Sequence, residues 1–193
     1  DAGFSSSNTY SLSGTTYGSD GLASAMTIAS GSATVSSVNA ATYSGFSTNS
    51  LVLSNSNYAI NGSSTISATI NKATLTVTGT TSPSRGYDST TTATISGGSL
   101  SGLVSGDTSV TLTQSGAYSS PNAGTGISIT MADSLGGTTA SGASAATNYT
   151  LTQPTVTGTI AQAPLNLTIS KTYNNDAGFS SSNTYSLSGT TYG

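Results

Sequence analysis

The chain has 193 residues, a net charge of −3 at pH 7, only three Lys and Arg residues in total, and neither His nor Cys. These counts exclude a Ser-His-Asp triad, a thiol nucleophile and an ordinary zinc site, and no phosphate-binding GxxxxGK[ST] loop occurs. Ser and Thr supply 76 residues, while ten Tyr and regularly spaced Val, Leu and Ile provide strand-forming side chains. We therefore expect a mainly β protein that is not an enzyme, holds no metal or cofactor and binds no nucleic acid.

The first eighteen residues, DAGFSSSNTYSLSGTTYG, recur unchanged as residues 176–193. Asp176 is the counterpart of Asp1, so the repeat distance is 175 residues. Identity over this length indicates recent duplication, and self-similarity at a fixed distance is typical of tandem arrays. We expect the chain to hold one full period of such an array and the start of the next copy.

Apolar side chains that alternate with hydroxyl side chains predict the strands. Strands are expected at 64–70, 73–79, 109–114, 126–130 and 164–170. In the second of these, Leu75 and Val77 face one side and the threonines the other. In the last, Leu165, Leu167 and Ile169 share one side. This alternation is typical of half-buried strands with a polar outer face.

Glycine-rich stretches punctuate the strands. The segments SGGSLSG at 96–102 and SLGGTTASG at 134–142 predict turns or loops. Residues 20–26 and 101–107 are candidates for short helical turns, although each is too short to be a stable helix alone. The composition therefore leaves room for one short helix in each β-rich module.

A weaker two-fold pattern divides the period. Asn57–Val77 aligns with Asn148–Leu167 across a one-residue gap, so Tyr58 matches Tyr149. The pattern predicts module A at 1–72, which lacks its first strand, module B at 73–162, and the start of the next module A at 163–193. We expect small β-rich modules arranged as an extended array.

Several motifs resemble known bacterial repeats. Residues 86–112, 122–130 and 148–160 together look like the YDG-type repeat of large bacterial surface adhesins. The segments KTYNN, VNAATYSG and NSNYAI in module A resemble the related MBG-type repeat. Both modules depart from the Tyr-Asp-Gly signature, since they read Tyr87-Asp88-Ser89 and Tyr173-Asn174-Asn175.

The resemblance implies a small β-grasp-like or sandwich-like domain and a structural role. The expected function is a stalk or filament segment of a secreted, filamentous-haemagglutinin-like adhesin at the bacterial cell surface, with neighbouring repeats of the same chain as partners. Two alternatives stay open: a self-assembling fibre subunit that exchanges strands or associates laterally, and a module that binds glycans or host surfaces. We expect no signal peptide or membrane span in this segment.

The few charged residues have a structural and a functional interpretation. Four aspartates were weighed as calcium ligands at module joints: Asp20, Asp88, Asp107 and Asp133. Calcium needs about six to eight oxygens, and no D-x-D pattern occurs, so turn and cap roles are favoured. Lys72 and Lys171 could form isopeptide links to Asn, but linker positions are favoured for both.

Two tyrosines and three asparagines complete the candidates. Tyr58 and Tyr149 could stack on a ligand, but a core ring with its hydroxyl bonded to the backbone is favoured. Asn61, Asn148 and Asn166 begin N-x-[ST] glycosylation patterns, which are expected by chance in such a sequence. No catalytic, cofactor or metal residue is therefore assigned.

Overall fold

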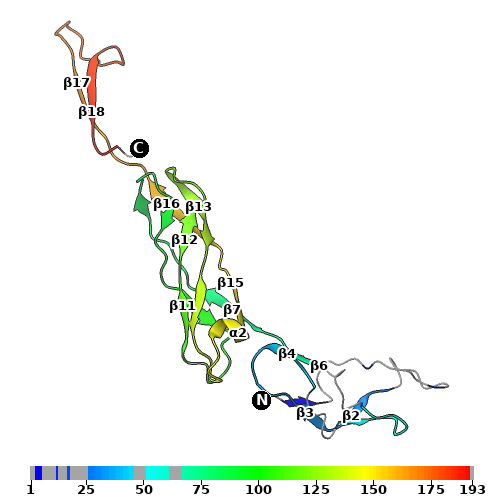
Figure 1. Ribbon diagram of the computed structural model, residues 1–193. Coiled ribbons are helices and arrows are strands. Elements are labelled where there is room, and N and C mark those ends of the chain that lie inside the picture. The colour runs from blue at the N-terminus through cyan, green and yellow to red at the C-terminus, as the bar shows by residue number, and fades with distance from the viewer. Residues whose placement is uncertain are drawn as a thin grey trace. The chain divides into compact units, whose positions relative to one another are not determined.

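The computed structural model describes residues 3–5, 12, 17, 26–45, 51–60 and 67–191, and its strands confirm a mainly β chain (Figure 1). The helical turn considered at 20–26 lies outside these residues except for Met26. The chain divides into two compact units: residues 1–73, 104–110 and 137–150 in unit 1, and residues 74–103, 111–136 and 151–193 in unit 2.

Unit 1 contains three short antiparallel strand pairs and one helix. The pairs are β1 (Gly3–Ser5) with β3 (Ser32–Thr34), β2 (Ile28–Ser30) with β5 (Val52–Leu53), and β4 (Ala41–Ser44) with β6 (Ser67–Ile70). The helix is α2 (Ala145–Asn148). Small apolar side chains fill the interior, and Ala33 and Ala145 are almost completely buried. Serine and threonine supply much of the remaining sequence, so this unit buries little apolar surface.

Unit 2 is built on a five-stranded sheet with the order β8-β16-β13-β12-β9. These strands are β8 (Arg85–Gly86), β16 (Val156–Ala161), β13 (Gly124–Met131), β12 (Gly116–Tyr118) and β9 (Thr92–Ala93). The pairings are antiparallel except that of β16 with β8, which is parallel. Ile127 and Ile129 alternate with polar residues along β13, as the sequence predicts for 126–130.

The principal core lies against this sheet. Its buried members are Tyr118, Ile129, Met131, Val156 and Ile160. The phenol ring of Tyr118 lies over the backbone of Gly158: a β-carbon added there would sit 2.4 Å from the Tyr118 hydroxyl and 2.8 Å from its ring. A glycine at this position therefore makes room for the largest side chain of the core.

Two smaller sheets complete the domain. β10 (Ser99–Ser101), β7 (Ala73–Thr78) and β15 (Tyr149–Thr152) form one with β7 in the middle, and β11 (Val110–Thr113) pairs with β14 (Ser134–Gly137). β7 follows the predicted alternation, with Leu75 fully buried, Val77 buried and its threonines exposed. The loop predictions at 96–102 and 134–142 are partly wrong, because β10 and β14 lie inside them.

The helical turn considered at 101–107 is also wrong. This segment ends β10 and closes in a tight turn in which the Asp107 N–H donates to the Val104 carbonyl at 3.1 Å. Gly102 and Gly106 have φ of +97° and +96°, which right-handed helices do not use. The short helix of the described chain is α2 instead, a single turn that carries no side-chain N-cap bond.

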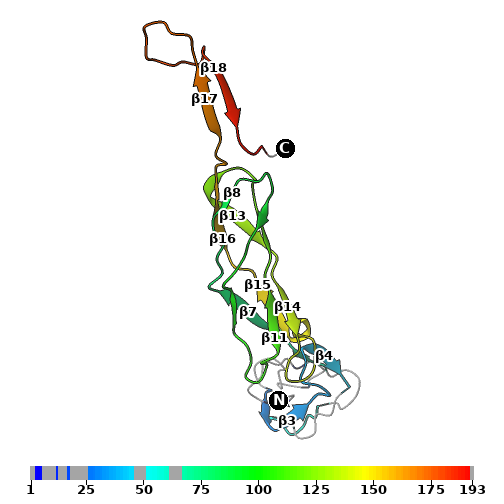
Figure 2. The same cartoon turned by 90° about the vertical axis from the view of Figure 1, so that its left-hand side faces the viewer.

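The last two strands form a separate hairpin. β17 (Asn166–Ser170) and β18 (Thr184–Ser188) pair antiparallel over five residues and lie side by side in both views (Figure 1; Figure 2). The strand predicted at 164–170 is present, but its apolar side is not half-buried as expected: Leu167 is 61% exposed. The reason is that no further strand joins this two-stranded sheet in the described chain.

Candidate functional site

The most buried polar contact joins Tyr149 to Asp107. Tyr149, at the start of β15, is 3% exposed, and its hydroxyl donates to the Asp107 carboxylate. The same hydroxyl accepts a bond from the Val104 N–H at 2.9 Å. The other Asp107 oxygen accepts from the Ala140 N–H at 2.6 Å. Ring burial and a bond to the backbone agree with the structural interpretation of Tyr149 from the sequence.

The two acidic groups of this contact have opposite pKa shifts. The Ala140 N–H and then the Tyr149 hydroxyl lower the pKa of Asp107 below its ordinary value, although burial opposes them. Burial first, and then the hydrogen bond to Asp107, raise the pKa of Tyr149 above its ordinary value. Both shifts favour the charged Asp and the neutral Tyr, the combination in which the hydroxyl donates to the carboxylate.

A second polar cluster lies beside this contact, and we call it the asparagine junction: Asn39, Ala40, Thr139, Ser141 and Asn148. The Asn148 side-chain oxygen accepts from the Ala40 N–H at 2.7 Å. Its amide nitrogen donates to the Asn39 oxygen at 2.9 Å and to the Thr139 hydroxyl at 3.2 Å. The Ser141 hydroxyl donates to the same Asn39 oxygen at 2.6 Å. The junction connects residues up to 109 positions apart in the chain.

Lys72 lies at the edge of the junction. Its ammonium group donates to the Ala146 carbonyl, in α2, at 2.6 Å. That contact satisfies one of the carbonyls that a helix of four residues leaves without an internal partner. The sequence considered an isopeptide link for this lysine, and the structure places its nitrogen on a backbone oxygen.

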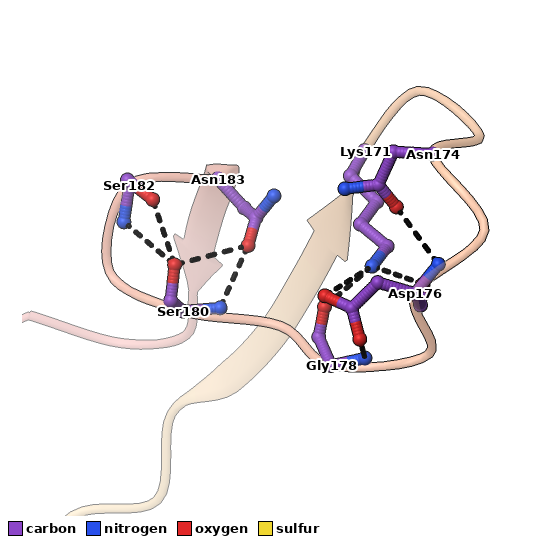
Figure 3. A network of polar contacts seen from close by, with 7 residues as sticks. All are labelled: Lys171, Asn174, Asp176, Gly178, Ser180, Ser182 and Asn183. Atoms are coloured by element: carbon purple, nitrogen blue, oxygen red, sulfur yellow. Dashed lines mark hydrogen bonds and ion pairs between the residues drawn. The ribbon is translucent and has the colours of Figure 1, made fainter.

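Lys171 organises the loop between β17 and β18 (Figure 3). Its ammonium group donates to the carbonyl oxygens of Asp176 and Gly178 and lies 3.5 Å from the Asp176 carboxylate. It also lies 5.3 Å from the centre of the Phe179 ring, within the range of a cation–π contact. The lysine therefore holds a loop conformation, and Asn174 in this loop accepts from the Asp176 N–H at 3.3 Å.

The remaining aspartates of the described chain also occupy turns. Asp88 accepts from the backbone N–H of Thr90 at 2.9 Å and from its hydroxyl at 2.8 Å, and it pairs with Arg85. The Thr90 N–H, followed by the Thr90 hydroxyl and Arg85, lowers the Asp88 pKa. Arg85 in turn lies 5.2 Å above the Tyr118 ring. The candidate Asp20 lies outside the described residues.

Asp133 combines one bonded oxygen with one that has no partner. Its Oδ1 accepts from the Ser115 N–H at 3.1 Å, while its Oδ2 is buried without a hydrogen-bond partner. Gln153 bonds both its N–H and its carbonyl, at 2.9 and 2.8 Å. Within the described residues, no three acidic side chains gather into a group that could hold a metal ion. The structure does not bring Asp88, Asp107 and Asp133 together.

The other sequence candidates have separate positions. The Tyr58 hydroxyl accepts from the Tyr17 N–H at 3.0 Å, so it bonds the backbone as Tyr149 does. Of the glycosylation patterns, Asn61 lies outside the described residues and Asn166 is exposed on β17. Both donors of the Asn148 amide nitrogen are used in the junction, so a glycan on that nitrogen would remove one of them.

The asparagine junction is the site that sequence reasoning missed. The segment VNAATYSG contains Asn39 and Ala40, and its similarity to PNAGTGIS was the only signal that it carried. The cluster contains amides, hydroxyls and backbone groups, so its chemistry is to hold segments together by hydrogen bonds. Within the described part of the chain, no helix has the length and hydropathy needed to span a bilayer.

Comparison with known families identifies one domain. The family model described as the YDG domain matches residues 71–157, so a YDG domain occupies this part of the chain and the prediction of a YDG-type repeat is confirmed there. The match covers β7 to the first residues of β16, including Asp107, Tyr149 and the Asn148 half of the junction. No curated protein and no solved structure matches the chain.

Proposed function

We propose that the chain is a structural repeat segment, a stalk or filament of a secreted bacterial surface adhesin that carries a distal region away from the cell. The recurrence of residues 1–18 as residues 176–193 carries the proposal, because it indicates an array with a period of 175 residues. The YDG domain at 71–157 fits within one period. In such arrays, length grows by whole periods while each module keeps its own fold.

The surface chemistry supports the same role. Threonine side chains on the exposed side of β7 supply β-propensity and a polar surface at once. The chain has six Asp, three Lys and Arg, and no His, so few groups change charge with pH. A filament outside the cell meets changing pH and salt, and its stability would depend little on either.

The asparagine junction supports a defined geometry along the segment. Asn39 and Lys72, which precede the YDG domain or lie at its start, bond Asn148 and Ala146 far along the chain. Each neutral hydrogen bond of this kind contributes about 0.5–1.5 kcal/mol. Several together restrict the angle between successive segments, which favours a stalk with directed reach over a flexible tether. This role requires no catalysis.

Particle length tests the proposal. Chains with one, two and three 175-residue periods would be compared by small-angle X-ray scattering and cryo-electron microscopy. We expect the maximum dimension to rise by the same increment for each added period. A radius of gyration that follows the weak scaling of a compact globule, about the 0.38 power of chain length, would contradict the proposal.

A further inference from the structure

The hairpin of β17 and β18 has one apolar face that the structure leaves uncovered. Leu167 is the pairing partner of Leu187, and Ile169 is the partner of Tyr185, so these four side chains share one face. Leu167, Leu187 and Tyr185 are 61%, 57% and 56% exposed. The opposite face carries hydroxyl and amide side chains. An isolated two-stranded hairpin is marginally stable in water, so this face requires a cover.

The repeated sequence indicates what the cover is. β18 lies within residues 176–193, whose identical counterpart, residues 1–18, is followed by residues 19–72. Leu187 corresponds to Leu12, and Leu12 is half-buried whereas Leu187 is exposed. The same leucine in the same sequence is therefore covered where the residues of unit 1 are present.

Backbone pairing gives a second, independent indication. In the first copy, Gly3–Ser5 forms β1 and pairs with β3. In the second copy, Gly178–Ser180 lies outside any strand. There the N–H groups of Gly178 and Ser180 bond the side chains of Asp176 and Asn183, at 2.9 and 2.7 Å (Figure 3). A segment that forms a strand beside β3 thus has only side-chain caps without it.

We infer that a second copy of this chain covers the hairpin, with its residues 26–72 as the acceptor. Residues 178–180 of one molecule pair antiparallel with β3 of the next, in the register that β1 uses: Gly178 opposite Thr34, Phe179 opposite Ala33, and Ser180 opposite Ser32. The apolar face of the hairpin then packs on the acceptor. The contact is head-to-tail, so it generates linear chains of molecules.

Sequence identity makes the exchange feasible. The incoming residues 176–193 replace contacts of residues 1–18 with identical contacts, so the replacement itself is nearly neutral. The net gain comes from β17, which has no equivalent before residue 1 in the 193-residue sequence and brings Leu167 and Ile169 into the interface. The inference rests on the proposed repeat role, because the same contact would join successive periods of an array.

Cysteine cross-linking tests the register, because the chain contains no Cys. A Ser32→Cys chain and a Ser180→Cys chain would be mixed and oxidised. Residues directly opposite in an antiparallel pair have Cα atoms about 4.5–5.5 Å apart, within disulfide range. We expect the mixed disulfide dimer to exceed both homodimers. Ser101→Cys on exposed β10 replaces Ser180→Cys as the matched control for random collision.

The cross-link yield separates the inference from its rivals. If the mixed dimer forms no faster than the Ser101→Cys control, the proposed register is wrong. Two hairpins could instead stack on each other through their apolar faces, and association without a mixed 32–180 disulfide would show that arrangement and overturn the inference. A double Ser5→Cys, Ser32→Cys chain locks the resident β1 in place, so its oxidation should block association.

Two leucine substitutions should change association in opposite directions. Leu187→Ser alters only the incoming hairpin, so sedimentation velocity should show a dissociation constant raised roughly tenfold or more. Leu12→Ser weakens the resident copy, so it should lower the dissociation constant. Equal effects, or a wild-type chain that stays monomeric at high concentration, would overturn the inference. The thermal unfolding of the YDG domain, unchanged in both variants, checks that they fold.

The two proposals fail separately. A monomeric 193-residue chain in arrays that still lengthen by equal increments removes the head-to-tail contact and leaves the stalk. Head-to-tail association of a chain whose multi-period forms are compact removes the stalk and leaves the contact.

Discussion

The hydroxyl of Tyr149 donates a hydrogen bond to the carboxylate of Asp107, 42 residues earlier in the chain. The acceptor is charged and the pair is buried, which makes the bond stronger than one between neutral groups. Because the same hydroxyl accepts from the Val104 N–H, it fixes the turn that follows β10 against the start of β15. The contact joins distant parts of the YDG domain through one phenol group.

Removal of that phenol oxygen should destabilise the domain. Tyr149→Phe leaves the buried Val104 N–H without its acceptor, and a lost partner of this kind costs about 1–3 kcal/mol in the free energy of unfolding. Urea denaturation measures the loss. Tyr58→Phe is the matched control, because the bond from Tyr17 is exposed and its removal should cost less. Equal losses in the two variants would contradict this account of Tyr149.

Stability should be flat across neutral pH and fall at both extremes. The pKa of Asp107 is lowered in the fold, so its contribution is present above the ordinary aspartate pKa and is lost as the pH falls below about 4. The pKa of Tyr149 is raised, so its contribution is present below about pH 10 and is lost as the pH rises beyond it. No His side chain titrates between these limits.

Urea midpoints from pH 3 to pH 11 measure this profile. Asp107→Asn should reduce the fall on the acid side, and Tyr149→Phe should reduce it on the alkaline side. A midpoint that moves substantially between pH 5 and pH 9 would show that groups outside this pair control the pH dependence.

Strands were predictable where apolar side chains alternate. In β7 the pattern is complete, and Leu75 and Val77 are buried as predicted. β10 and β14 escaped because they are rich in Ser and Gly, residues that favour turns. Both are held by backbone pairing with a neighbouring strand, as Leu100 opposite Val77 shows, and such pairing leaves little trace in composition.

Long-range polar contacts were less predictable than strands. Tyr149 carried a signal, because its match to Tyr58 indicated a structural ring. Asn39 and Asn148 carried none for their contact, since 109 positions separate them and asparagine is common in turns throughout this sequence. The exposure of Leu167 also escaped, because alternation predicts which side chains share a face and not what covers that face.

The contact between Tyr118 and Gly158 predicts a position that cannot accept a side chain. Gly158→Ala would force the buried Tyr118 ring away from the sheet, and overpacking of this kind costs about 1–3 kcal/mol. Thermal unfolding measures the change. Gly86→Ala is the control in the same sheet, because a β-carbon there meets nothing within 4 Å. A Gly158→Ala protein as stable as the Gly86→Ala protein would show that the ring moves at little cost.

The asparagine junction predicts coupling between two distant side chains. Asn39→Ala and Asn148→Ala each remove one partner of the 2.9 Å bond, so the double variant should lose less stability than the two single losses added together. We expect a coupling energy of about 0.5–1.5 kcal/mol from a double-mutant cycle in urea. Asn166→Ala, at an exposed position of β17, replaces Asn148→Ala in the control cycle and should show no coupling to Asn39. Additive losses for Asn39 and Asn148 would mean that the bond does not hold the segments together, and the directed reach proposed for the stalk would then need another origin.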